Sequence, residues 1–185
     1  EVWTQIKPFW QTLRPLLFFA FKKDSNKYLK AINEVASHAG IYGMIGGQVV
    51  DVESENKFID KDKLDFIHLN KTAALIVACM RAGAIVGGAN EDELQRITKY
   101  GKNIGLSFQI VDDILDITGD EAKLGKPIGS DIENHKSTYP SLLGLEKSRE
   151  IARELIEEAK SSIEGFSSDL EFLKQLGDYI ISRDC

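Results

Sequence analysis

This 185-residue sequence has few cysteines, no excess of basic charge and no long apolar run, and each shortage excludes a class of protein. The two cysteines, Cys79 and Cys185, are too few for a disulfide framework or for a zinc site of their own, which favours a reducing, cytoplasmic compartment. Acidic residues outnumber basic ones by 29 to 23, so a general nucleic-acid-binding surface is not expected. The most apolar early run, residues 16–21, is far shorter than the roughly 18–20 residues that span a bilayer. We therefore expect no nucleic-acid partner and no membrane span.

Helical periodicity runs along most of the chain. Apolar residues recur at steps of three and four, which is the spacing of one helical face, and no alternating β pattern occurs. The pattern predicts helices over residues 26–51, 60–88 (as one or two), 91–118, about 145–164 and 169–182. In the first of these, the inner face is assigned to Leu29, Ile32, Val35, Ala36, Ala39 and Tyr42. No linker or repeat divides the chain, so we expect one all-α domain over residues 1–185.

The strongest local signal is an aspartate-rich segment in the helix over residues 91–118. Asp112 and Asp116 lie about 40° apart around a helix, Asp113 lies about 100° from Asp112, and Gln109 shares that surface. Three crowded carboxylates repel one another unless a cation neutralises them, and oxygen ligands suit Mg²⁺. A solvated acidic helix face is the alternative, but the apolar residues on both sides indicate a packed helix. The sequence therefore favours a metal site.

Basic residues supply a second set of candidates. Lys71 and Thr72 interrupt an apolar helix, and Lys126 and Lys136 belong to a long polar loop over residues 119–140. Loops of more than about 12–15 residues in compact domains are usually functional or disordered. Each lysine alone would be interpreted as a surface residue, but together with the aspartates they predict a pocket for Mg²⁺ and a diphosphate.

Glycine is concentrated at residues 43–47, within the first predicted helix. Glycine in a helix interior costs about 1 kcal/mol relative to alanine, so three of them indicate close helix packing or a kink. Gln48 and Asp51, three residues apart, would present polar groups together on this otherwise apolar helix. A plain helix crossing and a functional site are both compatible with this pattern.

Taken together, these segments resemble the trans-isoprenyl diphosphate synthases of the polyprenyl synthetase family, the farnesyl and geranylgeranyl diphosphate synthases. The resemblance covers about residues 31–183, and its motifs are Gly43 to Gln48, His68 to Thr72, Phe108 to Asp116, Gly119-Asp120, Leu124 to Lys126, Asp131 and Lys136 to Pro140. It implies a helical bundle around a central cavity, a homodimer or higher oligomer, and Mg²⁺. It also implies condensation of an allylic diphosphate with isopentenyl diphosphate to a short-chain product.

The resemblance also implies a role for each matching residue. Mg²⁺ would be held against the allylic diphosphate by Asp112, Asp113 and Asp116. The catalytic set would be Lys71, Thr72, Gln109 and Lys126, in which the lysines neutralise the diphosphate and the other two orient it. Substrate-binding residues would be these four together with Lys136, Phe108 and Gln48.

One part of the family pattern has no counterpart here. The family carries a first aspartate-rich motif on an earlier helix, followed by paired arginines, and no such segment occurs in this sequence. Since the chain also begins at Glu1 rather than Met, we expect a fragment or processed form that resembles the C-terminal two-thirds of a synthase, lacks the N-terminal helices and is inactive alone. A non-catalytic partner subunit of a complete synthase is the alternative. A terpene cyclase fits poorly, because Asn134 to Ser137 does not match that family's metal triad.

Overall fold

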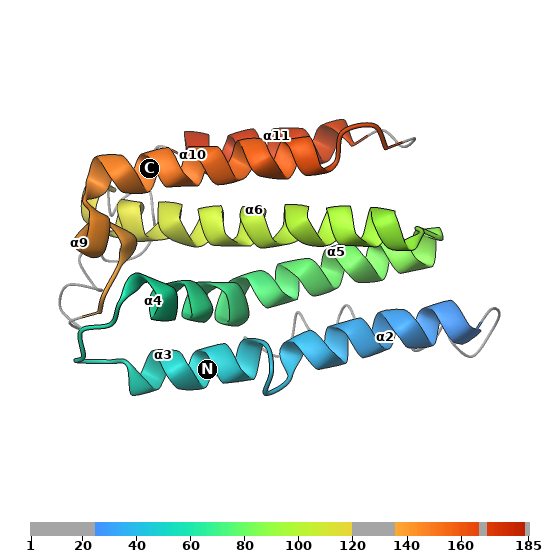
Figure 1. The fold of residues 1–185 in the computed structure, drawn as a ribbon, viewed down its shortest axis with the longest axis horizontal. Coiled ribbons are helices and arrows are strands. Elements are labelled where there is room, and N and C mark those ends of the chain that lie inside the picture. The colour runs from blue at the N-terminus through green and yellow to red at the C-terminus, as the bar shows by residue number, and fades with distance from the viewer. Residues whose placement is uncertain (1–24, 120–135, 167–169, 184–185) are drawn as a thin grey trace.

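Helices make up all the regular structure in the computed structural model, which describes residues 25–119, 136–166 and 170–183 (Figure 1). This confirms the predicted all-α fold. The elements are α2 (Ser25–Ala39), α3 (Met44–Glu53), α4 (Lys61–His68), η1 (Leu69–Ala73), α5 (Ala74–Gly87), α6 (Glu91–Thr118), α9 (Tyr139–Leu143), α10 (Leu145–Ser162) and α11 (Glu171–Ser182).

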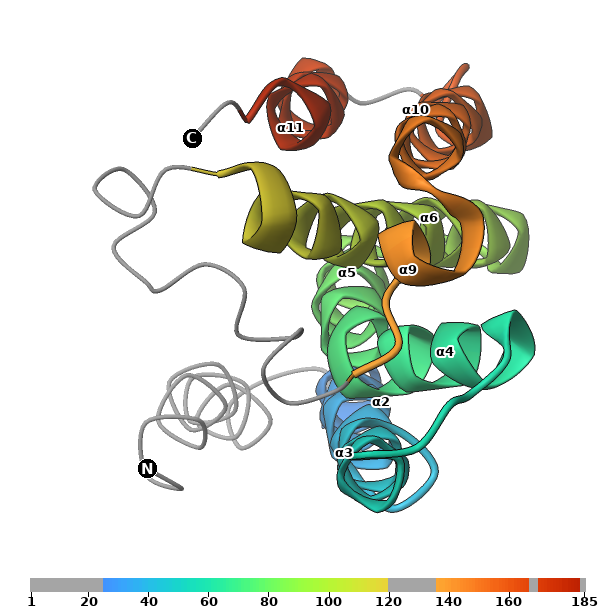
Figure 2. The ribbon, with the colours of Figure 1, turned by 90° about the vertical axis from the view of Figure 1, so that its left-hand side faces the viewer.

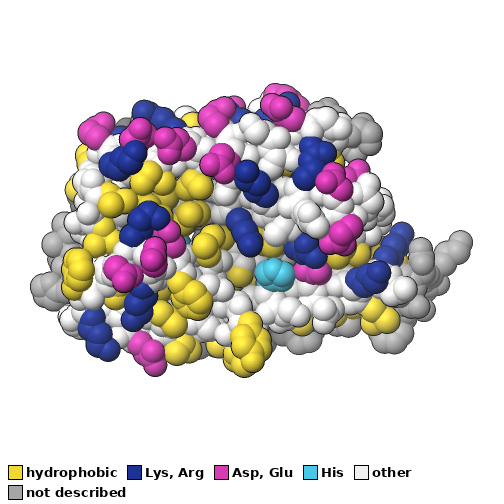
Figure 3. Space-filling view, in the orientation of Figure 1, with side chains coloured by type: hydrophobic (Ala, Val, Ile, Leu, Met, Phe, Trp, Pro, Cys, Tyr) yellow, Lys and Arg dark blue, Asp and Glu magenta, His cyan; other side chains and the backbone are white. Residues whose placement is uncertain are grey.

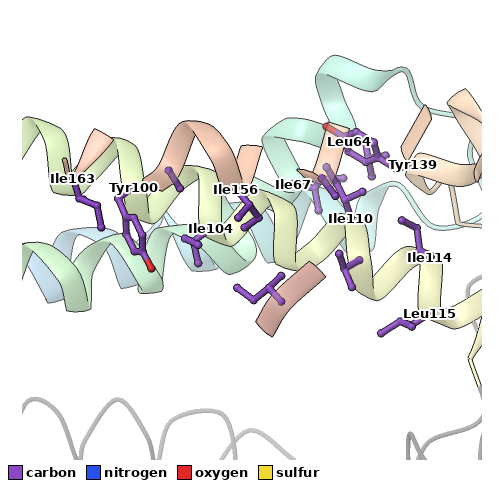
Figure 4. Close-up of a cluster of buried hydrophobic side chains, with 14 of the residues drawn as sticks. Leu64, Ile67, Tyr100, Ile104, Ile110, Ile114, Leu115, Tyr139, Ile156 and Ile163 are labelled. Atoms are coloured by element: carbon purple, nitrogen blue, oxygen red, sulfur yellow. The ribbon is translucent and has the colours of Figure 1, made fainter. Parts of the chain in front are cut away.

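The helices stack in layers, with α6 in the middle. Successive α2 and α3 form one outer layer, α4 to α5 form the next, and α10 and α11 lie on the far side of α6 (Figures 1 and 2). Figure 4 shows the main core along α6, where apolar side chains from neighbouring layers meet. Its members include Leu64, Ile67, Tyr100, Ile104, Ile110, Ile114, Leu115, Tyr139, Ile156 and Ile163. Burial of these residues fixes α6, and therefore the aspartates on it, relative to α4 and α10.

The bounds of α6 agree with the prediction because strong local signals mark its start. The Asn90 side chain accepts a hydrogen bond from the Glu93 backbone N–H at 3.0 Å, and the Glu93 carboxylate accepts one from the Asn90 backbone at 2.8 Å. This capping box satisfies two of the donors that a helix N-terminus leaves unpaired. Helices α10 and α11 are slightly shorter than predicted. The predicted loop over 119–140 ends earlier than expected, because α9 begins at Tyr139.

The single helix predicted over residues 26–51 is wrong. A turn over residues 40–43 separates α2 from α3, and a Cβ added at Gly43 would lie 2.6 Å from the backbone carbon of His38. The predicted inner face also fails at Leu29, which is 57% exposed within α2, and at Tyr42, which lies in the turn and is 92% exposed. Val35 is buried against α5 as predicted, and Ala31, which was not assigned to the inner face, is buried there as well.

The helix predicted over residues 60–88 is one continuous helical stretch with an internal irregularity. Its middle, η1, is a π-helix, and its end is marked by Gly88 at φ 88°, a conformation that favours glycine. Among the described residues, this stretch is the one that length and composition would allow to cross a membrane. The stretch packs between α2–α3 and α6, and 33% of its apolar window is buried there.

Apolar side chains also remain exposed on the outer layer. Figure 3 shows hydrophobic side chains gathered mainly over the left-hand part of the face in view. On α3 and the turn before it, the exposed ones are Ile41, Tyr42, Ile45, Val49 and Val52. Exposed apolar patches favour association, so the predicted oligomer stays a prediction with this surface as its candidate interface.

Candidate functional site

A cavity of about 310 Å³ opens where α3, α4, η1 and α6 meet the segment before α9. Its polar lining comes from five parts of the chain and combines acids, lysines and neutral donors. The lining residues are Asp51, Ser54, Ile59, Leu64, Ile67, His68, Lys71, Gln109, Asp112, Asp113, Asp116, Lys136, Ser137 and Thr138. Residues far apart in sequence therefore share one cavity, as the predicted diphosphate pocket requires.

Asp113 is held by hydrogen bonds from three parts of the chain. Its side chain is buried, with 3% of the residue exposed, and it accepts three hydrogen bonds. Gln109 Nε2 donates to Asp113 Oδ1 at 3.4 Å, and the backbone N–H of Tyr139 donates to Oδ2 at 3.0 Å. His68 Nε2 lies 3.3 Å from the same Oδ2. These contacts use much of the acceptor capacity of Asp113, so it is better placed to organise the site than to bind a ligand.

The hydrogen-bond chain continues from Asp113 to η1. Thr72 Oγ1 donates to Gln109 Oε1 at 3.0 Å, which fixes the amide so that its nitrogen points to Asp113. Helix η1 comes close to both neighbouring helices, because glycines face it there. A Cβ at Gly47 would lie 2.8 Å from the carbonyl carbon of Asn70, and one at Gly105 would lie 2.6 Å from Ala73 Cα. π-Helical segments are frequent at functional sites, and this one directs Lys71 and Thr72 to α3 and α6 respectively.

Two lysines meet one carboxylate on the other side of the cavity. Lys71 Nζ donates to Asp51 Oδ2 at 2.6 Å, and Lys136 Nζ lies 3.7 Å from the same oxygen. The Asp51 side chain is 14% exposed, whereas both lysine side chains are more open. The ammonium groups therefore sit together at the cavity, held by one shared acid.

Tyr139, the first residue of α9, contacts His68 and Asp65 beside the cavity. Its ring stacks on His68 with centroids 5.9 Å apart, and its hydroxyl donates to Asp65. Burial, with a smaller contribution from the bond to Asp65, raises the pKa of the Tyr139 hydroxyl well above its usual value, so the neutral donor form is kept. The segment that carries Lys136 is fixed at a second point, where the Ile59 backbone N–H donates to Ser137 Oγ at 3.2 Å.

Two of the aspartates, Asp112 and Asp116, suit magnesium that is also bound by a diphosphate. Asp112 and Asp116 lie one helical turn apart on α6 and both line the cavity. Among the described residues, no group of three or more His, Cys, Asp or Glu side chains is close enough to hold a metal by itself. Mg²⁺ is commonly bound by one or two carboxylates together with substrate phosphates and waters, so these two acids beside a diphosphate would suffice.

The structure brings together most of the predicted site residues, but not all of them. Lys71, Gln109, Lys136 and the three aspartates line the cavity, and Thr72 bonds to Gln109 beside it. Gln48 is not among the lining residues. Phe108 is not a lining residue either: it packs against the core, under the guanidinium of Arg183 at 4.7 Å. Lys126 lies outside the described residues.

Three contributors were missing from the predicted site: Asp51, His68 and Tyr139. Asp51 had a detectable signal, as a charged residue three positions after Gln48 in an apolar helix. His68 and Tyr139 belong to the resembling motifs, but their contacts join positions 45 and 26 residues from Asp113. Only the packing of α4, α6 and α9 makes those contacts.

Comparison with known proteins matches this geometry to a family. The polyprenyl synthetase family model matches residues 12–172. The chain belongs to the polyprenyl synthetase family. Farnesyl diphosphate synthase of Bacillus subtilis is 46% identical over 160 residues, which cover 86% of this chain and 54% of that protein. Farnesyl diphosphate synthase of Escherichia coli is 47% identical over 160 residues, covering 84% and 54%.

Solved structures of this family show the same helical fold. The chain matches geranyltransferase of Helicobacter pylori, solved with magnesium and isoprenyl diphosphate, with a TM-score of 0.72 at 30% identity. That match covers 86% of this chain and 52% of the other. The chain thus spans about half the length of the polyprenyl synthetase relatives that it matches.

Proposed function

We propose that this chain forms the diphosphate-binding part of a Mg²⁺-dependent short-chain prenyltransferase, which condenses an allylic diphosphate with isopentenyl diphosphate. The observation that carries the proposal is the convergence of Lys71, Lys136, Asp112 and Asp116 on one cavity. Lysines are compact charges suited to phosphate oxygens, and paired acids on one helix suit Mg²⁺. The names of the polyprenyl synthetase relatives support the same reaction class.

Each group would contribute to the departure of the diphosphate. Mg²⁺, when held by Asp112 and Asp116, supplies Lewis-acid stabilisation of the charge on the leaving pyrophosphate. Lys71 and Lys136 would bind oxygens of the same group and stabilise that charge further. Thr72 and Gln109 orient the wall of the cavity, and Asp113 fixes Gln109. Pre-positioned charge of this kind is usually the largest single contribution to lowering a barrier.

Calorimetric titration of inorganic pyrophosphate in the presence of Mg²⁺ tests the proposal. We expect the unsubstituted chain to bind, and Lys71→Ala to weaken binding about tenfold or more, because hydrogen bonds to charged groups contribute about 1.5–3 kcal/mol. Little loss of stability is expected, since the Lys71 side chain is 36% exposed.

Lys57→Ala is the matched control. Lys57 is exposed, lies outside the cavity and donates to the backbone oxygen of Glu53. Its removal should leave the affinity for pyrophosphate unchanged. Equal affinities for the unsubstituted chain and Lys71→Ala would contradict the assignment of the cavity as the diphosphate site.

A further inference from the structure

Asp51 contributes a negative charge to a cavity that would have to bind an anion. Its Oδ2 accepts a hydrogen bond from Lys71 at 2.6 Å and lies 3.7 Å from Lys136 Nζ. At 14% exposure it is the least exposed member of this trio. The carboxylate therefore takes one hydrogen-bond donor of Lys71 and attracts the ammonium of Lys136, the two charges that a diphosphate would use.

The charges around the cavity make this contact important. Four carboxylates line it, against two lysines, so the described lining is net negative before any cation enters. The acids are Asp51, Asp112, Asp113 and Asp116. A diphosphate without a metal brings further negative charge to this lining, whereas a diphosphate that carries Mg²⁺ brings much less. Like charges at short range in a partly buried site cost several times more than they do in water.

We propose that Asp51 is a positioning residue that makes diphosphate binding depend on the metal. The inference rests on the proposed function. Before the ligand arrives, Asp51 holds the ammonium groups of Lys71 and Lys136 side by side at the cavity. When the diphosphate binds, those donors exchange the carboxylate for phosphate oxygens, and Asp51 is left beside the ligand. Mg²⁺ offsets the resulting repulsion, and an uncomplexed diphosphate leaves it uncompensated.

Asp51→Asn isolates the charge, because asparagine keeps the shape and one acceptor oxygen of aspartate. We expect metal-free pyrophosphate to bind about tenfold more tightly to Asp51→Asn than to the unsubstituted chain, a change that corresponds to about 1.4 kcal/mol. With Mg²⁺ present, the two affinities should agree within about threefold, because the metal already offsets the Asp51 charge. For each chain, calorimetry gives the dissociation constant in a chelator divided by that in Mg²⁺. This ratio should be about tenfold smaller for Asp51→Asn than for the unsubstituted chain.

Two further variants separate this role from a structural one. Glu53→Gln, on the same helix and exposed, removes a charge outside the cavity and should leave the ratio unchanged. Asp51→Glu restores the charge and should restore the ratio. Thermal unfolding of each variant without ligand checks that the fold is intact, so a changed ratio reports on the site.

The outcomes are distinct. An Asp51→Asn ratio equal to that of the unsubstituted chain would overturn the role given to Asp51. A loss of more than about tenfold in the Mg²⁺-supported affinity of Asp51→Asn would also overturn it, because it would make Asp51 a metal ligand. Failure of the unsubstituted chain to bind pyrophosphate with Mg²⁺ would instead overturn the proposed function.

Discussion

Replacing Gly105 with alanine should destabilise the fold, although alanine is the better helix former. Gly105 is buried in the middle of α6, where this helix meets η1. A Cβ built there would lie 2.6 Å from Ala73 Cα and 3.4 Å from Ile76 Cδ1. The nearer atom belongs to the backbone of η1, so no side-chain rotation can relieve the contact.

The magnitude follows from two opposing effects. Alanine gains about 1 kcal/mol over glycine in a helix interior. Against this, forcing extra volume into a packed contact typically costs about 1–3 kcal/mol, occasionally more, and here the backbone of η1 must move. We expect a net loss of about 1–2 kcal/mol in the free energy of unfolding. Because η1 carries Lys71 and Thr72, the affinity for pyrophosphate should also fall.

Urea unfolding gives the free energy for Gly105→Ala and for a matched control, Gly83→Ala. Gly83 lies in α5, is exposed and would have no atom within 4 Å of an added Cβ. This control should gain about 0.5–1 kcal/mol from helix propensity alone. Opposite signs for the two variants are therefore expected. A Gly105→Ala chain as stable as the unsubstituted one would refute the proposed close approach of α6 to η1.

Two further predictions concern the outer helices and the activity of the chain. Arg81 donates to both carboxylate oxygens of Glu34, at 2.7 and 2.8 Å, and to Thr98 at 2.8 Å, so it joins α2, α5 and α6. The substitution Glu34→Gln should therefore lower the free energy of unfolding by about 1–3 kcal/mol at pH 7. The hydrogen bonds from Arg81 lower the pKa of Glu34, so this stabilisation is present above about pH 4.5 and is lost as the pH falls through the lower folded pKa. In urea unfolding from pH 7 to 3, the free energies of unfolding of Glu34→Gln and the unsubstituted chain should therefore converge. A constant difference would contradict the pairing. The chain alone should form prenyl product at rates far below the usual 1–10³ per second of enzymes. Its sequence holds one aspartate-rich motif, and each electrostatic group removed from an active site costs about 10²–10³ in rate. Product formation at ordinary rates from allylic and isopentenyl diphosphates would contradict this prediction.

Local signals in the sequence were enough to predict most of the fold. The bounds of α6 follow from the apolar spacing, and the capping box that the structure shows at Asn90 marks the same start. The break between α2 and α3 was not predicted, because periodicity continues across the turn and the glycines there were compatible with either close packing or a kink. Both interpretations apply: Gly43 lies at the turn, and Gly47 packs on η1.

The candidate site could likewise be predicted only in part. Asp112, Asp116 and Lys71 were predicted from residue type and helical spacing, which local sequence determines. The partners of Asp113 and the pairing of Asp51 with Lys71 depend on how layers pack, and no local pattern specifies that. Phe108 was predicted to face substrate from the resemblance alone, whereas its ring packs under Arg183.

The most direct test of the diphosphate site is a crystal of this chain grown with pyrophosphate and Mn²⁺, a substitute for Mg²⁺ that gives an anomalous signal. We predict an anomalous peak within coordination distance of Asp112 or Asp116, with pyrophosphate oxygens hydrogen-bonded to Lys71 and Lys136. The central claim would be contradicted by manganese bound elsewhere. It would also be contradicted by a cavity without pyrophosphate, in which Asp51 still pairs with Lys71 and Lys136.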